Sequence, residues 1–101
     1  MSEDELRKDV SRAVRMKEWA AGDEGLFSIF DAVERAYLAT IADSKLTDTA
    51  GREQLYHRVS ALRDVRKVMQ DTISKGMSAT KLIEAMTAKA EKKQRKAPNV
   101  A

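Results

Sequence analysis

The segment GREQLYHRVSALRDVRKVMQ, residues 51–70, decides the fold because its apolar residues recur at helical spacing. Successive members of the series, which continues past residue 70, are 4, 3, 7 and 4 residues apart, and such spacing places side chains on one face of an α-helix. Arg66 stands on the same face where the pattern asks for another apolar group. The apolar seam consists of Leu55, Val59, Leu62, Met69 and Ile73.

The seam predicts a long helix over residues 48–75, with Thr47 or Thr49 as its cap. At 1.5 Å per residue this helix spans about 42 Å. A compact domain of 100 residues has a radius of gyration near 13 Å and is about 30–35 Å across, so the helix should extend beyond its own core. We therefore expect the seam to form a protein interface with another copy or a larger partner. Arg66 would set the register of that interface or meet an acid across it.

The flanking segments also read at helical spacing. A first helix is expected over residues 3–21, because Ser2 and Glu5 have the spacing of a capping box and Gly22 follows as a stop. The segment that follows Gly22 is strongly apolar at helical spacing and predicts a second helix over residues 24–42. Gly76 follows Lys75 as a helix-ending glycine does, and a short fourth helix is expected over residues 79–93, capped by Ser78.

These elements predict an all-α protein. Valine and isoleucine never alternate with polar residues in a strand-like period. The expected architecture is a helical hairpin or three-helix core with one long helix, a short fourth helix and a basic C-terminal tail. Residues 1–88 would form the helical domain and residues 89–101 the tail.

Composition predicts a thin core. Hydrophobic residues make up 43% of the 101 residues, but 15 of them are alanine. Fewer than 30 larger apolar side chains remain, and their burial falls well short of the entropy cost of ordering a chain of this length. A partner surface would therefore help to stabilise the fold.

Catalytic and metal-binding patterns are missing. Glu53 and His57 have a spacing of four residues, which suits two ligands on one metal, but His57 is the only histidine and there is no cysteine. No serine stands in a nucleophile motif, and no glycine-rich loop could hold a phosphate. We expect no enzyme activity, no cofactor and no small-molecule substrate.

The sequence also predicts no membrane contact. The acidic N-terminal segment is not expected to be a signal peptide, and no apolar run approaches the ~18 residues that cross a bilayer.

The alternative interpretation is a nucleic-acid-binding accessory or regulatory protein. The segment ISKGMSATKLIEAM, residues 73–86, resembles a helix-turn-helix in its pattern of helix, glycine turn and Ser-capped helix. The tail carries five cations against Glu91, a net charge of +4 in a chain of net charge +3. It contains no aromatic residue for base stacking, so binding would lack sequence preference. The candidate cations are Lys89, Lys92, Lys93, Arg95 and Lys96.

The run AYLATIADSKLTDTAGREQLYHRVSALRDVRKVMQDTISKG resembles small helical proteins of tailed bacteriophages and prophages, encoded among virion and packaging genes. The resemblance covers about residues 19–76, and the basic end lies outside it. It transfers no active-site residue. The residues that carry it are Trp19, Tyr37, Thr40, Arg52, Glu53, Leu55, Tyr56, Leu62 and Gly76.

The resemblance implies a phage origin and a role in particle assembly or DNA packaging. Together with the seam, it predicts a non-enzymatic structural or virion-assembly protein that acts through helix–helix contacts. The expected partners are further copies of the chain, larger phage structural proteins, or both. The expected location is the virion or the host cytoplasm.

Overall fold

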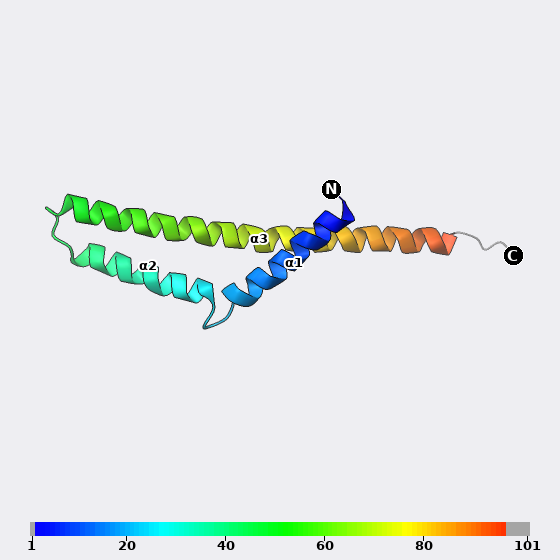
Figure 1. Cartoon of the computed structure of the whole chain (residues 1–101), viewed down its shortest axis with the longest axis horizontal. Helices are drawn as coiled ribbons and strands as arrows, with labels where there is room; N and C mark the ends of the chain where they lie inside the picture. Colours follow the sequence, from blue (N-terminus) through cyan, green and yellow to red (C-terminus); the bar gives the residue numbers. More distant parts are fainter. Residues whose placement is uncertain (1, 97–101) are drawn as a thin grey trace.

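The computed structural model describes residues 2–96, and side chains as far as Gln94. Three α-helices follow one another: α1 over Glu3–Ala20, α2 over Leu26–Asp43 and α3 over Thr49–Lys96 (Figure 1). The described residues contain no strand, so the predicted all-α class is confirmed. The first two helices begin and end within two residues of the predicted bounds.

The helix ends follow local chemistry. The Glu5 amide donates to Ser2 Oγ at 3.2 Å, and three acids in the first turn of α1 face the positive end of its dipole. Gly22, with φ of +97°, allows the chain to turn out of α1. The start of α3 is capped by Asp48, whose Oδ1 accepts from the Gly51 amide at 3.1 Å, and not by a threonine as predicted.

The predicted break at Gly76 is wrong, because α3 runs without interruption for 48 residues. There is no separate fourth helix over residues 79–93, and the segment 73–86 contains no turn, so it is not a helix-turn-helix. Gly76 is buried where α1 crosses α3, and a Cβ built on it would lie 2.0 Å from Ala13 Cβ. The glycine therefore permits close packing of two helices and does not end one.

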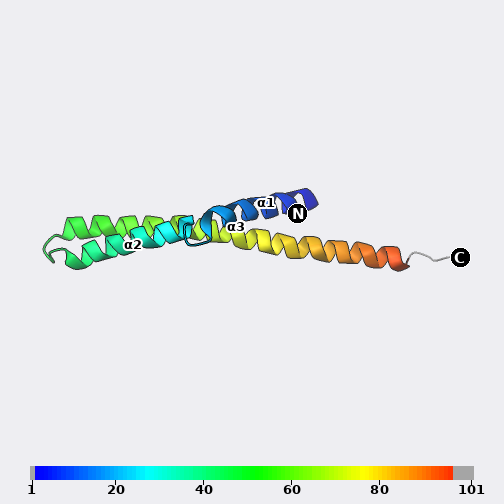
Figure 2. The same ribbon diagram turned by 90° about the horizontal axis from the view of Figure 1, so that it is seen from below.

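The molecule is a rod. Both α1 and α2 run antiparallel to α3 and lie in succession along it, α2 on its first half and α1 on its middle (Figures 1 and 2). The described chain measures 86 × 25 × 17 Å with a radius of gyration of 22.4 Å. A compact chain of this length has a radius near 13 Å. The hairpin of α2 and α3 is present, but the three helices do not enclose a common core as a three-helix bundle would.

The interior is correspondingly thin. No large side chain among the described residues is fully buried, and three of the seven buried hydrophobic residues are alanines. None of the described helices combines the length and the apolar character needed to cross a bilayer. The buried hydrophobic residues are Leu6, Ala13, Ala20, Ile41, Val59, Met69 and Ala79.

Candidate functional site

The predicted seam faces the chain's own shorter helices. Val59 and Met69 are buried, and the other three seam residues are half-buried. Ile73 lines a shallow groove together with residues of α1, and Leu62 lines another with residues of α2. The contacts described are therefore intramolecular, and a role of the seam between molecules stays a prediction.

Polar contacts fix the register of α2 on α3. Arg66 pairs with the carboxylate of Asp31 and donates to the Phe27 carbonyl oxygen at 3.2 Å. Arg63 Nε donates to Glu34 Oε1 at 2.5 Å. Arg66 thus meets an acid across the seam, and that acid belongs to the same chain.

Small residues set the crossing of α1 and α3. Besides the contact with Ala13, a Cβ on Gly76 would lie 2.9 Å from the Asp9 carbonyl oxygen. Ala13 and Ala79 are both buried. The two backbones therefore approach closely, and larger side chains are pushed to either side of the crossing.

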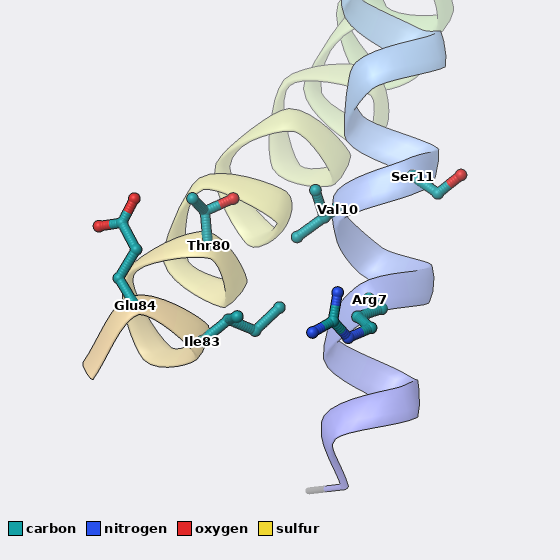
Figure 3. Close-up of a pocket in the computed structure, with 6 residues that line it drawn as sticks. All are labelled: Arg7, Val10, Ser11, Thr80, Ile83 and Glu84. Atoms are coloured by element: carbon teal, nitrogen blue, oxygen red, sulfur yellow. The ribbon is translucent and has the colours of Figure 1, made fainter. Parts of the chain in front are cut away.

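An open cavity lies between the two helices beyond this crossing (Figure 3). Val10 of α1 and Ile83 of α3 extend into the space between the helices, whereas Glu84 points away from α1. Arg7 pairs with Glu3 at 2.8 Å, and the Thr80 hydroxyl donates to the Gly76 carbonyl oxygen at 3.0 Å. The cavity is therefore bounded by the apolar side chains of Val10 and Ile83, and the Thr80 hydroxyl on its wall is bonded to the backbone.

Two pairs of apolar side chains on another side of α3 remain exposed, one on each side of its crossing with α1. Val68 is 64% exposed and Leu82 is 53% exposed, and their separation of 14 positions is close to four helical turns. Val65 and Met86, 49% and 45% exposed, lie near the same line. We call this set, Val65, Val68, Leu82 and Met86, the exposed stripe.

Trp19 of α1 extends this apolar surface. Its side chain is 62% exposed, and it lines an open cavity together with Met16 and with Thr72 of α3. Thr72 lies four residues after Val68, on the same side of α3. The exposed stripe therefore borders a tryptophan, a residue type enriched at binding hot spots.

Sequence reasoning missed the exposed stripe. The spacings of three residues from Val65 to Val68 and four from Leu82 to Met86 were visible, but the stronger seam explained the helix without them. Polar residues, including Lys75, separate the two pairs along the sequence. Only the positions of α1 and α2 show which apolar face stays uncovered.

The residues considered for chemistry are solvent-facing. Glu53 and His57 are exposed, and Tyr56 is 52% exposed in an open hollow with Leu46 and Arg52. Within the part of the chain that the structure describes, no three residues of the metal-ligating types come together.

The candidate cations lie on the last turns of α3. Lys89, Lys92 and Lys93 are exposed on the last turns of α3. Arg95 and Lys96 belong to the same helix, but their side chains, like residues 97–101, lie outside the described part. Every residue from Glu84 to Gln94 is exposed, so this end of α3 has no cover from α1 or α2.

Comparison of the chain with protein-family models, with curated proteins and with solved structures found no match.

Proposed function

We propose that the protein is a non-enzymatic structural or assembly component that acts by helix–helix association, with further copies of itself and with larger proteins of a phage particle. The phage setting is supported by the resemblance carried by residues 19–76. The mode of action is supported by the exposed stripe.

The exposed stripe is the single observation that carries the proposal. Large hydrophobic side chains that stay exposed outnumber those that are buried, and four of them share one face of α3. Covering a valine or leucine side chain contributes about 1.5–3 kcal/mol. A second helix laid along α3 would gain this contribution from each stripe residue it covers, and from Trp19 beside them.

The rod shape supports the same proposal. A helix of 48 residues presents its stripe over several turns, which suits a partner helix better than a globular ligand. Association would also compensate for the thin interior, because a rod one or two helices thick buries little apolar surface on its own.

The test is the mass of the purified chain by analytical ultracentrifugation from about 5 to about 200 µM, where association depends on concentration. We expect species heavier than the 11.3 kDa monomer. The double variant Val68→Gln, Leu82→Gln should weaken association at least about tenfold, equivalent to about 1.4 kcal/mol. Glutamine keeps helix propensity close to that of leucine, so the circular dichroism spectrum should not change.

The matched control is Ser74→Gln, an exposed position of the same helix on another face. It should associate like the wild type. A monomer at every concentration would contradict the proposal, and so would a double variant that associates as strongly as the control.

A further inference from the structure

We propose that the projecting end of α3 binds the phosphate backbone of duplex nucleic acid through a lysine face formed by Lys81, Lys89, Lys92 and Lys93. This inference goes beyond self-association, because three of the four lysines, Lys89, Lys92 and Lys93, lie past Met86, where the exposed stripe ends. It also differs from the helix-turn-helix interpretation, which the continuous helix excludes.

The first argument is the separation of charge around the helix. At 100° per residue, the four lysines fall within about 120° of one another. Glu84 and Glu91, seven residues apart, lie together about 125° from the middle of that face. All six side chains are exposed, and no ion pair joins the acids to these lysines within the described residues.

The second argument is that helix stability does not account for the pattern. Cations stabilise the negative end of a helix dipole, but the effect falls off within the last turn. Lys81 and Lys89 stand more than one turn before Lys96, where α3 ends. Dipole compensation also has no preference for one side of the helix, whereas the lysines share a side.

The third argument is shape. The end of α3 projects past the start of α1 as a single helix (Figures 1 and 2). A single helix is about 10–12 Å across with its side chains, and the major groove of DNA is about 12 Å wide. Because neither α1 nor α2 covers residues 84–94, the helix can enter the groove without displacing another element.

The chemistry of the face favours nucleic acid over other anionic partners. A helix that lies on a lipid surface needs an apolar side opposite its lysines, but that side here carries Glu84, Thr87 and Glu91. Lysine is depleted in protein interfaces, where aromatic residues and arginine anchor the contact. A row of lysines without an aromatic anchor matches repeated phosphates, and it predicts binding without base readout.

The experiment is fluorescence anisotropy of the full chain with a labelled mixed-sequence duplex of about 24 base pairs. With about three phosphate contacts, affinity should fall about 40-fold between about 50 and about 200 mM salt. The variant Lys89→Gln, Lys92→Gln, Lys93→Gln should bind at least about tenfold more weakly at the lower salt and should lose most of the salt dependence.

The matched control is Lys8→Gln, Lys17→Gln, Lys45→Gln, which removes the same charge from exposed positions off this face. It should bind within about threefold of the wild type, since distant exposed charges are largely screened. Equal weakening of both variants would overturn the proposal, because net charge and not the face would then govern binding.

Competition with polyglutamate at the same charge concentration distinguishes a preference for nucleic acid from a preference for acidic proteins. It should compete poorly with the duplex for the wild-type chain. If it competes as well as unlabelled duplex, the face binds polyanions in general and the proposal for nucleic acid fails. It fails also if no binding to the duplex is measured at the lower salt.

Discussion

At Gly76 the absence of one carbon atom sets the distance between two helices. The hydrogen in place of a Cβ lets the backbones of α1 and α3 approach until Ala13 occupies the space that a side chain would need. Glycine costs about 1 kcal/mol relative to alanine inside a helix. Its presence in the middle of a continuous helix is therefore explained by packing and not by local preference.

We predict that Gly76→Ala lowers the stability of the protein although it raises helix propensity. A Cβ at 2.0 Å from Ala13 Cβ and 2.9 Å from the Asp9 carbonyl oxygen forces the helices apart. Overpacking of this kind costs about 1–3 kcal/mol. Urea denaturation should show a lower unfolding midpoint.

The control for propensity is Ser78→Ala, an exposed site two residues along the same helix, which should leave the midpoint unchanged or raise it slightly. Adding Ala13→Gly to Gly76→Ala should recover part of the loss, since it removes the methyl group that clashes. A Gly76→Ala variant more stable than the wild type would show that the crossing is looser than described.

Residue patterns in the sequence were enough to place the cap of α1 and the seam, but not the cap of α3 or the role of Gly76. Ser2 with Glu5 is a local signal, and the hydrogen bond it predicts is present. A glycine after a lysine at the end of an apolar run has the same local signature whether it ends a helix or admits a neighbour. Only the partner, Ala13, distinguishes the two, and it lies 63 positions away in the sequence.

At the scale of elements, α3 is the scaffold on which the other two helices are arranged. Its seam turns toward α2 in the first half, where Arg66 and Asp31 pair, and toward α1 near Gly76. The sequence predicted the class and most helix bounds because those depend on local periodicity. It did not predict that α1 and α2 would lie in succession, because that order depends on the close crossing at Gly76.

The continuity of α3 can be tested with Ser78→Pro. If a new helix began near this position, proline would be tolerated there. In a continuous helix it removes the hydrogen bond to the carbonyl of the preceding turn and clashes with that turn, at a cost of about 3 kcal/mol. We expect a large drop in the urea midpoint and in helical circular dichroism, with Ser78→Ala as the control.

An unchanged midpoint for Ser78→Pro would mean that the chain breaks at Gly76 after all, and would restore the fourth helix. The same result would remove the argument from shape for the lysine face, because residues 79–96 would no longer be a fixed extension of α3.

At the scale of the whole molecule, the rod carries two kinds of surface that meet over residues 81–86 of α3. The exposed stripe and Trp19 are apolar and extend from the middle of α3 to Met86, whereas Lys89, Lys92 and Lys93 lie beyond Met86 on its projecting end. Association through the stripe would thicken the rod and leave the lysines past Met86 free. A pair of chains could therefore bind one duplex at two points, which strengthens binding without any new contact.

The two surfaces predict opposite responses to salt. Burial of apolar surface is weakened little by sodium chloride and is strengthened by sulfate, because sulfate is excluded from the protein surface. Phosphate binding releases counterions and weakens steeply as salt rises. Ultracentrifugation and anisotropy in the same buffers should show an assembly mass that holds or increases while duplex affinity falls about 40-fold between about 50 and about 200 mM salt. If mass and affinity fall together, association depends on charge or on bound nucleic acid, and the apolar stripe is not what joins the chains.

The stripe variant Val68→Gln, Leu82→Gln distinguishes apolar association from association through charge. If apolar contact holds the assembly, the variant should have a lower assembly mass than the wild type at all salt concentrations. If charge holds it, the assembly mass should be unchanged.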